Sequence, residues 1–281
     1  MVEICNLKAV ITCAGKGTRL LPFSKELPKE MAPIFTTGQN GMEIKPLLQQ
    51  IFENLYSCGL RDFCFVTGRT KRSIADHFSP DLSFETIPSQ LERFYEILSN
   101  SNIMWVNQFK PRGFGDAVNV SRPYVSESNF ILQAGDVSIF PKNQSPILKL
   151  ISLAKNTDIE AAILLKTVID PERHGIATIE TNSELMKVIK VVEKPDHPES
   201  SLGIMPVYMF RKSIFNALEK TRPGKNNEIQ LTDAIQALID SGKKVVAIRV
   251  DEDTILDVGT PESFWKALNQ SYNLLPAEKK F

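Results

Sequence analysis

The stretch Leu7-Lys-Ala-Val-Ile-Thr-Cys13, followed at once by Ala14-Gly-Lys-Gly-Thr-Arg19, decides the fold. The first seven residues are rich in β-formers, as in a buried strand of a parallel sheet. The next six include two glycines, a lysine and an arginine, so backbone N–H groups can approach phosphate oxygens while the cations neutralise them. A strand running directly into such a loop is typical of an anion site.

The same loop differs from two common phosphate-binding motifs. The P-loop needs four residues between its first glycine and the Gly-Lys-Ser/Thr element, and this loop lacks that spacing. Leu20 stands where the dinucleotide-binding fingerprint has its third glycine. From these six residues alone, an ordinary glycine turn with two solvated cations remains an alternative.

Strands and helices are expected to alternate in the first half. The strand-like runs are 7–13, 63–67, 103–106 and 130–133, and the helical runs are 45–59 and a segment from about residue 115. This alternation predicts an α/β fold with a Rossmann-like, doubly wound and mostly parallel sheet. Ligands of such sheets bind at the carboxyl ends of the strands.

The second half continues with strands and then helices. Strands are expected at 161–167, 177–180, 188–192 and 245–250, and helices at 212–220, 231–241 and from Pro261, whose fixed φ suits a first helical turn. We find no internal repeat and no low-complexity linker, so residues 1–281 are expected to form a single domain. The polar, turn-rich stretches 36–42 and 79–90 are expected to be mobile loops.

Composition excludes several classes of protein. The chain has 281 residues, 42% of them hydrophobic, which is enough for a substantial core. Lys+Arg and Asp+Glu number 33 each, so no global field attracts nucleic acid or an anionic membrane. No apolar run reaches the roughly 20 residues that cross a bilayer. We expect no nucleic-acid and no membrane partner, and anions must be held by local groups.

The cysteines and histidines indicate no disulfide and no zinc site. Cys5, Cys13, Cys58 and Cys64 show no C-x-x-C spacing, and the three histidines lie far apart. The first segment is too polar for a signal peptide. We therefore interpret the cysteines as reduced core thiols of a cytoplasmic protein.

The glycine-rich loop continues as Leu21-Pro-Phe-Ser-Lys-Glu-Leu-Pro-Lys-Glu-Met31. The run from Ala14 to Met31 resembles the signature of sugar-phosphate nucleotidyltransferases, most closely the bacterial-type UTP–glucose-1-phosphate uridylyltransferases. The resemblance implies a GT-A-like fold with an inserted sugar-binding sub-domain. The approximate halves would be 1–145 for the nucleotide and 146–281 for the sugar phosphate and the C-terminal helices.

The resemblance also assigns roles within the loop and to a later segment. The loop would bind the nucleotide through Ala14, Gly15, Gly17 and Thr18, and the catalytic cations on the triphosphate would be Arg19 and Lys29. The segment Gln108-Phe-Lys-Pro-Arg-Gly113 is similar to the base-reading element of the family. Its glutamine side chain and its glycine backbone would contact the pyrimidine edge.

A glutamine both donates and accepts hydrogen bonds, which fits the mixed edge of uracil. Taken alone, however, Gln108 before a glycine-rich turn is equally an ordinary loop residue. Family members often carry His, Gln or Asn where this chain has Asp116. The role of Asp116 is therefore open.

Two aspartates are candidate magnesium ligands. An apolar run ends at Asp136, which places a carboxylate at the sheet edge where ligands bind, and Mg²⁺ prefers hard oxygen ligands. The Gly-Asp element is similar to the metal site of the family, and Asp257 in Leu256-Asp-Val-Gly-Thr-Pro261 resembles its second ligand. The alternative at each position is an aspartate that only caps a turn.

A sugar-phosphate site is implied by Val192-Glu-Lys-Pro195. In the family this element binds the sugar hydroxyls through the glutamate, here Glu193, and the phosphate through the lysine, here the catalytic Lys194. Gly175 resembles the sugar-side glycine, and Glu228 is a further candidate sugar contact. From strand geometry alone, Glu193 and Lys194 would point to opposite faces unless a bulge re-aims one of them.

These elements predict transfer of a nucleotide from UTP to glucose 1-phosphate, giving UDP-glucose and pyrophosphate by Mg²⁺-assisted in-line displacement. The sugar phosphate is already ionised, so the reaction needs no general base and no protein nucleophile. Thymine differs from uracil by one methyl, worth only about 0.8 kcal/mol when buried, so a dTTP-dependent enzyme is an alternative.

The sugar substrate is also open, because another hexose or N-acetylhexosamine 1-phosphate would suit the same elements. The alternative from another class of protein is a nucleotide-sugar-binding regulator that has the fold but does not catalyse the reaction. The substrates imply small-molecule partners. The relatives commonly assemble as dimers or tetramers, which implies a homodimer or homotetramer here.

Overall fold

A single nine-stranded sheet runs through the computed structural model, which describes residues 7–38, 41–69, 71–81, 83, 85–141, 145–180, 186–251 and 253–279. The strand order is β5-β4-β1-β6-β11-β8-β12-β10-β9. The strands are β1 (Leu7–Cys13), β4 (Asp62–Thr67), β5 (Asn102–Asn107), β6 (Asn129–Ala134), β8 (Ile159–Thr167), β9 (Gly175–Glu180), β10 (Met186–Glu193), β11 (Leu202–Phe210) and β12 (Lys244–Arg249).

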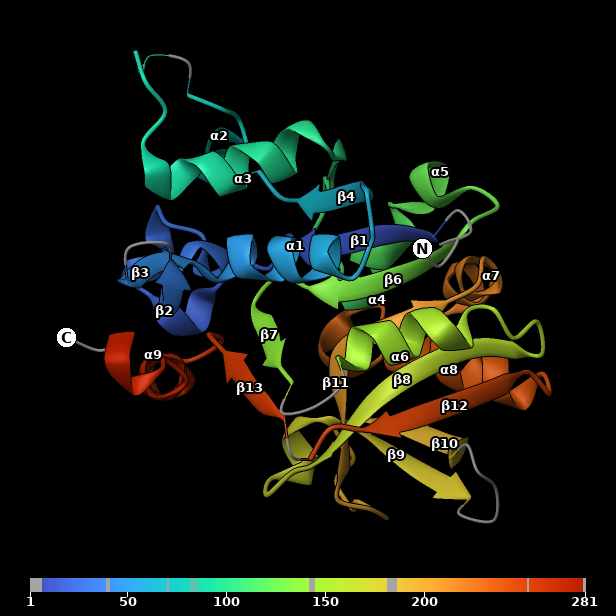
Figure 1. Cartoon of the computed structure of the whole chain (residues 1–281). Helices are drawn as coiled ribbons and strands as arrows, with labels where there is room; N and C mark the ends of the chain where they lie inside the picture. The colour runs from blue at the N-terminus through green and yellow to red at the C-terminus, as the bar shows by residue number, and fades with distance from the viewer. Residues whose placement is uncertain are drawn as a thin grey trace.

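Helices cover both faces of this sheet (Figure 1). They are α1 (Leu47–Ser57), α2 (Arg72–His77), α3 (Ser89–Ser99), α4 (Phe114–Asn119), α5 (Arg122–Val125), α6 (Pro146–Leu153), α7 (Ser213–Lys220), α8 (Leu231–Asp240) and α9 (Pro261–Asn273). Successive side chains of a strand point to opposite faces. Ala9 and Ile11 thus pack with α1, α3 and α6, whereas Val10 packs with α4, α7 and α8.

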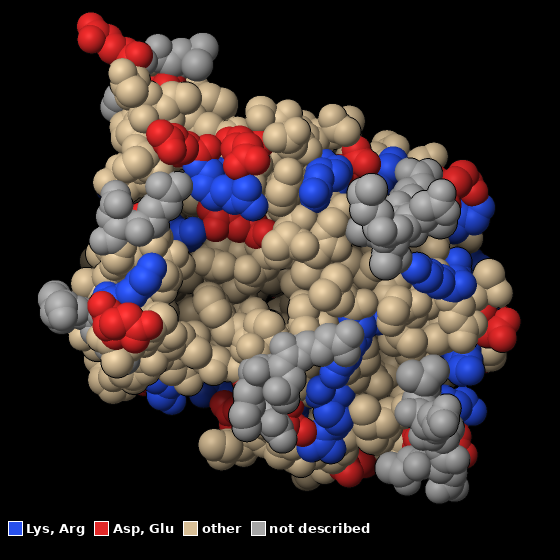
Figure 2. All heavy atoms as spheres, viewed as in Figure 1, with Lys and Arg blue, Asp and Glu red and all other residues tan. Residues whose placement is uncertain are grey.

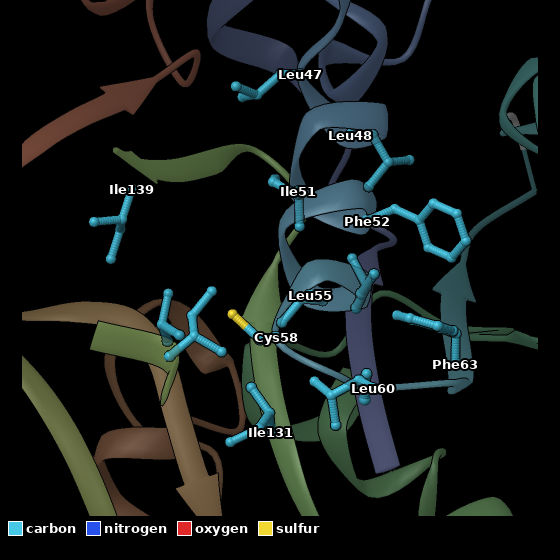
Figure 3. Packing of buried hydrophobic residues seen from close by; sticks show 14 of the residues in the cluster. Leu47, Leu48, Ile51, Phe52, Leu55, Cys58, Leu60, Phe63, Ile131 and Ile139 are labelled. Atoms are coloured by element: carbon cyan, nitrogen blue, oxygen red, sulfur yellow. The ribbon is translucent and has the colours of Figure 1, made fainter. Parts of the chain in front are cut away.

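The amphipathic helix α1 shows how the sequence forms the core. Leu48, Ile51, Phe52 and Leu55 recur at helical spacing and are fully buried. Figure 3 shows these side chains among other buried residues, with Phe52 directed toward Phe63 of β4. Burying a side chain of this size contributes about 1.5–3 kcal/mol, so this face fixes α1 on the sheet.

The first half of the sheet is parallel, as the alternation predicts. The strands β5, β4, β1 and β6 all run in the same direction. Their carboxyl ends therefore meet at one edge, where the loop after β1 also lies. The predicted α/β fold with parallel strands in the first half is confirmed.

The second half of the sheet is mixed, which corrects the expectation that the sheet stays mostly parallel. β11 runs antiparallel to both β6 and β8, and β9 and β10 form an antiparallel pair. Only β12 pairs in parallel there, with β8. Antiparallel partners need no long crossover, so the short strand-like runs of this half fold back on one another. Gly203 of β11 also pairs with Ile176 of β9, which curves these strands into a ring.

The expected mobile loop at 36–42 is wrong. The strands β2 (Pro33–Gly38) and β3 (Gly41–Pro46) form a hairpin, in which Thr36 pairs with Glu43. The turn residues mark the tip of this hairpin, because β-branched threonines favour the strand that leads into it. Residues 39 and 40 lie outside the described residues. As a consequence the next helix begins at Leu47, later than expected.

The stretch 79–90 contains no strand or helix in its described residues before α3 begins at Ser89. Residues 82 and 84 lie outside the described part. The remaining expected strands and helices are present within a few residues of their predicted bounds. The helices α2, α3 and α6 and the strand β11 are additions that the sequence patterns did not indicate.

A small second sheet positions two of the predicted site residues. It pairs β7 (Val137–Phe140) with β13 (Thr254–Asp257), and Asp257 lies opposite Val137. These strands lie side by side in Figure 1, and β13 leads into α9. Helix α9 is capped by Thr260, whose hydroxyl accepts from the Ser263 N–H at 3.1 Å.

The surface carries no large region of one charge sign on the face shown in Figure 2. Lys, Arg, Asp and Glu are intermixed there, and the face is hollowed near its centre. In the described part of the chain, no helix has the length and apolar character needed to span a bilayer. Cys13, Cys58 and Cys64 are free and buried, as predicted, and Cys5 lies outside the described residues.

Candidate active site

The glycine-rich loop after β1 folds over a lysine. Three short 3₁₀ turns follow β1, at Thr18–Leu20, Phe23–Lys25 and Lys29–Met31. Gly17 has a φ of 66°, which glycine adopts without strain, and its carbonyl accepts from Ser24 Oγ at 2.6 Å. A Cβ on Gly15 would lie 3.5 Å from Lys29 Nζ. Glycine therefore leaves the backbone open directly over this cation.

Lys29 pairs with one of the two candidate metal ligands. Its Nζ forms an ion pair with Oδ2 of Asp136, at the carboxyl end of β6. Burial lowers the pKa of Lys29, but the charges of Asp136 and Glu30 outweigh it and raise the pKa above its ordinary value. Burial raises the pKa of Asp136, but Lys29 outweighs it, and the pKa is lowered. Both groups are charged near neutral pH.

The second aspartate lies beside the first. The Val258 N–H donates to the backbone oxygen of Asp136 at 3.1 Å, next to the β7–β13 pair. Burial first, and then the charge of Asp136, raises the pKa of Asp257. The Gly259 N–H donates to Asp257 Oδ1 at 2.7 Å. Two carboxylates therefore face a common region, and their mutual repulsion favours a cation between them.

The arginine of the loop reaches the same place. A Cβ on Gly259 would lie 2.9 Å from Asp257 Oδ1 and 3.3 Å from Arg19 Nη2. The guanidinium and the carboxylate thus flank one glycine. Residues from the two ends of the chain meet here because β13 returns the chain to the end of β6.

The two aspartates fit a magnesium ion. Mg²⁺ is commonly bound by one or two carboxylates, with substrate phosphates and water completing the shell. Among the residues that the structure describes, no group of three His, Cys, Asp or Glu side chains forms a complete protein cage. Lys29 contacts Oδ2 of Asp136, and a carboxylate can accept from a lysine through one oxygen while its other oxygen binds a metal. A metal here would need phosphate oxygens as further ligands.

The predicted base-reading segment packs beside the loop. The Gln108 N–H donates to Thr67 O at 2.8 Å, at the end of β4. Gly68, which follows Thr67, approaches Ala14 so closely that a Cβ would lie 3.4 Å from the Ala14 oxygen. Gly113 has a φ of 112°, and a Cβ there would lie 2.7 Å from Ile229 O. The segment is therefore clamped between the loop and the approach to α8.

The predicted sugar residues form a second group. Glu193 Oε2 accepts from Thr232 Oγ1 at 2.7 Å, and Glu193 Oε1 lies 3.0 Å from Lys194 Nζ. A Cβ on Gly175 would lie 3.1 Å from the threonine hydroxyl and 3.2 Å from Glu193 Oε2. The missing side chain at Gly175 keeps the carboxylate accessible.

Glu193 and Lys194 lie together, which corrects the simple strand expectation. Lys194 has a φ of +44°, so the chain turns out of the extended conformation directly after β10. Two bonds hold this unusual backbone: the Lys194 N–H donates to His174 O at 2.9 Å, and Lys225 Nζ donates to Lys194 O at 2.7 Å. A strained lysine held from both sides is typical of a functional position.

The sheet register relates the two groups. β11 is antiparallel to β6, with Val207 opposite Gln133, so the start of β11 extends past the end of β6, where Asp136 follows. A Cβ on Gly175 would lie 3.5 Å from Cδ1 of Ile204, in this first part of β11. The predicted sugar-binding residues Gly175 and Glu193 therefore lie at the same edge of the sheet as Asp136.

Comparison with known proteins identifies the family. Residues 8–273 match the family described as nucleotidyl transferase.

The chain belongs to the nucleotidyl transferase family.

Named relatives of this nucleotidyl transferase are similar over most of its length. UTP–glucose-1-phosphate uridylyltransferase 1 of Staphylococcus saprophyticus is 36% identical over 242 residues, covering 82% of this chain and 81% of the relative. UTP–glucose-1-phosphate uridylyltransferase of Mycoplasma pneumoniae is 32% identical over 272 residues, covering 92% and 90%.

Solved structures agree as well. A UDP-glucose pyrophosphorylase complexed with UDP-glucose has a TM-score of 0.84 and 28% identity, covering 96% of this chain and 99% of that one. A UTP-bound enzyme from Acinetobacter baumannii has a TM-score of 0.81 and 28% identity, covering 98% and 96%.

In this nucleotidyl transferase, the structure groups most of the residues that the sequence singled out. Glu228 is the exception in its neighbourhood, because it lies beside the predicted base contact. A Cβ on Gly113 would lie 2.8 Å from Glu228 Cβ. The structure therefore places Glu228 with the predicted base-reading segment and not with Glu193 and Gly175.

Several residues that contact and support the predicted site residues were not predicted from the sequence. Glu30 and Lys71 form an ion pair at 2.7 Å, with side chains only 1% and 5% exposed. Burial raises the pKa of Glu30, with Lys71 opposing it, and burial also raises the pKa of the Cys13 thiol. Lys71 carries no motif, so nothing in the sequence marked it. Lys225 was missed for the same reason, whereas Thr232 lies in the first turn of α8, where a Thr-Asp pair is typical of an ordinary helix start.

Proposed function

We propose that this nucleotidyl transferase transfers the uridylyl group of UTP to glucose 1-phosphate, giving UDP-glucose and pyrophosphate. The observation that carries the proposal is the convergence of Arg19, Lys29, Asp136 and Asp257 under a glycine-rich loop at the sheet edge. The sugar group around Glu193 lies at the same edge. The relatives that cover most of the chain are named for this reaction.

The main obstacle to the reaction is charge repulsion. Two substrates with roughly six negative charges must approach each other, while the chemistry itself is a displacement that needs little covalent help. A phosphate oxygen of glucose 1-phosphate attacks the α-phosphorus of UTP. The bond from that phosphorus to the β-phosphate oxygen breaks, and pyrophosphate leaves with the electron pair.

The protein contributes cations to this displacement. Lys29 and Arg19 act on the triphosphate, and Lys194 acts on the sugar phosphate. At an effective dielectric near 20, a cation about 4 Å from a phosphate charge is worth about 4 kcal/mol before desolvation. Since about 1.4 kcal/mol corresponds to tenfold in rate, a few such cations suffice. The raised pKa of Lys29 keeps it charged throughout the physiological range.

Magnesium belongs to this proposal through Asp136 and Asp257. When bound, Mg²⁺ would neutralise phosphate charge and polarise phosphoryl oxygens. The aspartates would hold it between the carboxyl end of β6 and the end of β13. Lys29 keeps Asp136 ionised and oriented for this task.

The cluster of Gly175, Glu193, Lys194 and Thr232 orients glucose 1-phosphate, which is the nucleophile. Thr232 fixes one oxygen of Glu193, which leaves the carboxylate directed toward the space that Gly175 leaves open. In this proposal Glu193 accepts hydrogen bonds from sugar hydroxyls, and Glu228 contributes from the side of Gly113. Lys194 is already turned toward Glu193 and meets the adjacent phosphate.

The assembly and the location of the enzyme belong to the same proposal. Trp265 of helix α9 and Leu274, which directly follows the helix, are 65% and 45% exposed, which suits contact with a second copy in a homodimer or homotetramer. Static light scattering would then give a multiple of 31.5 kDa. The free thiols of the described cysteines suit the reducing cytoplasm.

Product analysis tests the reaction directly. The purified chain is mixed with UTP, glucose 1-phosphate and MgCl₂, and pyrophosphate and the nucleotide sugar are quantified. UDP-glucose and pyrophosphate should form in equal amounts, and chelating the metal should stop the reaction. A panel with dTTP, galactose 1-phosphate and N-acetylglucosamine 1-phosphate ranks the substrates. No turnover with any pair would contradict the proposal and favour a nucleotide-sugar-binding regulator.

A further inference from the structure

Asp116 is a buried carboxylate whose role the sequence left open. It lies in the short helix α4 and is 2% exposed. Its two oxygens have different partners. Oδ2 accepts from Gln108 Nε2 at 2.7 Å, and Oδ1 accepts from Arg112 Nε at 3.1 Å and from Arg112 Nη2 at 2.7 Å. The arginine, with 61% of its side chain exposed, offsets the burial of this charge.

The contact with Asp116 fixes which end of the Gln108 side-chain amide faces the carboxylate. A carboxylate only accepts hydrogen bonds, so it selects the amide nitrogen and excludes the amide oxygen. The same nitrogen donates to Gly113 O at 3.2 Å. Both of its hydrogens are thereby used. Among the residues that the structure describes, none donates to Gln108 Oε1, which is therefore left as an acceptor.

A free donor lies near this acceptor. The Gly113 carbonyl is occupied by Gln108 and by the Ala117 N–H, but no described residue accepts from the Gly113 N–H. The neighbouring backbone is tied to Ile229, which donates to Arg112 O at 2.7 Å and accepts from Gly115 N at 2.9 Å. The segment thus presents a fixed acceptor and a fixed donor.

Uracil and cytosine present different hydrogen-bonding groups to this acceptor and this donor. Uracil carries a donor at N3 between two carbonyl acceptors, whereas cytosine has an acceptor at N3 and a donor at N4. A fixed Oε1 acceptor matches the N3–H of uracil and opposes the N3 lone pair of cytosine. Sites that hydrogen-bond a substrate group reject analogues that leave buried polar atoms unpaired.

We propose that Asp116, supported by Arg112, is a positioning residue that fixes the Gln108 amide and thereby selects a uracil-type base over cytosine. The inference rests on the proposed function, because it requires a nucleotide base at this segment. Asp116 acts only through Gln108 and does not contact the substrate itself.

The test measures kcat/KM for UTP and for CTP, with glucose 1-phosphate saturating. Asp116→Asn keeps the shape of the side chain but adds a donor, so the Gln108 amide can turn over. The ratio of kcat/KM for UTP to kcat/KM for CTP should fall at least about tenfold. The matched control is Asp62→Asn, which alters a half-buried carboxylate that accepts from the side-chain amide of Asn102, through Nδ2, at 2.9 Å. It should keep the wild-type ratio.

A second measurement needs no variant. The wild-type enzyme should use a UTP analogue methylated at N3 at least about 100-fold less efficiently than UTP, because the methyl group removes the donor that Gln108 Oε1 accepts. Equal use of this analogue would overturn the inference. So would an Asp116→Asn protein that is folded by circular dichroism and keeps the wild-type ratio. Failure of the proposed function looks different, because the wild type would then make no UDP-glucose.

Discussion

At the scale of single residues, paired buried charges support the glycine-rich loop after β1. Glu30 follows Lys29 directly, and its carboxylate pairs with Lys71, 41 positions later. Lys29 pairs in turn with Asp136. Removing one partner of a buried pair leaves an uncompensated charge, which is far more costly than removing both. The loop is therefore held by partners that must remain matched.

This pairing predicts a rescue in stability. Lys71→Met should lower the free energy of unfolding by about 3–5 kcal/mol, because Glu30 is left buried without its hydrogen-bonded ion-pair partner. Adding Glu30→Met should recover a large part of that loss. Urea denaturation of both variants measures it, with Lys45→Met as the control, since the Lys45–Glu53 pair retains 16% exposure on each side. A double variant no more stable than Lys71→Met would contradict the pairing.

Gly175 gives a prediction about substrate binding. In Gly175→Ala the new methyl group would lie 3.1–3.2 Å from Thr232 Oγ1 and Glu193 Oε2, tighter than ordinary contact. The methyl group also fills the space assigned to the sugar. The KM for glucose 1-phosphate should rise at least about tenfold, a loss of about 1.4 kcal/mol, while the KM for UTP stays near wild type. Equal effects on both KM values would argue against a sugar site at Gly175.

Residues with a motif were predictable from the sequence, and residues that only support them were not. Lys29 and Asp136 stood in recognisable runs, and the structure pairs them. Lys71 and Thr232 act through partners far away in the chain, so their roles depend on the tertiary structure. The turned conformation of Lys194 also escaped prediction, because a positive φ is uncommon for lysine.

At the scale of elements, the small β7–β13 sheet brings the two aspartates together. Its register sets Asp257 opposite Val137, next to Asp136. Helix α9 begins immediately afterwards and carries a complete capping box of Thr260 and Ser263. Capping this helix therefore also fixes the end of the segment that carries Asp257.

Loss of the cap should reduce stability. Thr260→Ala removes the acceptor for the Ser263 N–H and should lower the free energy of unfolding by about 1 kcal/mol. Thermal or urea denaturation measures the change. The control is Thr221→Ala. The Thr221 hydroxyl donates to Ala217 O at the C-terminal end of α7, so it caps no helix N-terminus. A Thr260→Ala protein as stable as wild type would show that the cap contributes little here.

The packing of α2 against α3 predicts a pH effect. Burial lowers the pKa of His77, against the opposing charge of Glu53, and its ring stacks on Phe94 at 5.2 Å. As pH falls through the ordinary value of 6.5, the unfolded chain gains a proton that the folded chain does not bind. The free energy of unfolding therefore falls with pH until the lowered pKa is reached.

His77→Gln should remove this contribution. Between about pH 7.5 and about pH 5.5, the wild type should lose more of its free energy of unfolding than the variant does. Urea denaturation at the two pH values gives the comparison. Equal losses in both proteins would mean that His77 titrates alike in the folded and unfolded states.

The sequence predicted the parallel elements better than the antiparallel ones. The alternation of strand and helix around β1, β4 and β6 has a clear periodicity. β11 was missed, although it joins the two halves of the sheet. Its buried run from Leu202 to Phe210 is nearly continuous in apolar character, and periodicity alone does not identify such a strand.

At the scale of the whole molecule, one sheet brings the predicted nucleotide-binding and sugar-phosphate-binding residues to one edge. The parallel strands end at the glycine-rich loop and the predicted base-reading segment, and the ring of β8 to β12 carries Gly175 and Glu193 to the same edge. The net charge is zero, so attraction of the anionic substrates depends on a few buried or half-buried cations. We propose that Lys29, whose Nζ lies beneath Gly15 of the glycine-rich loop, is the principal cation on the triphosphate.

The most direct test measures UDP-glucose formation from UTP and glucose 1-phosphate by wild type, Lys29→Met and Lys25→Met. Lys25 lies in the same loop, but its side chain is 76% exposed, and among the described residues its ion-pair partner is the neighbouring Glu26. We predict that Lys29→Met, folded by circular dichroism, loses at least about 100-fold in kcat, while Lys25→Met stays within about threefold of wild type. Near-wild-type turnover by Lys29→Met would contradict the account.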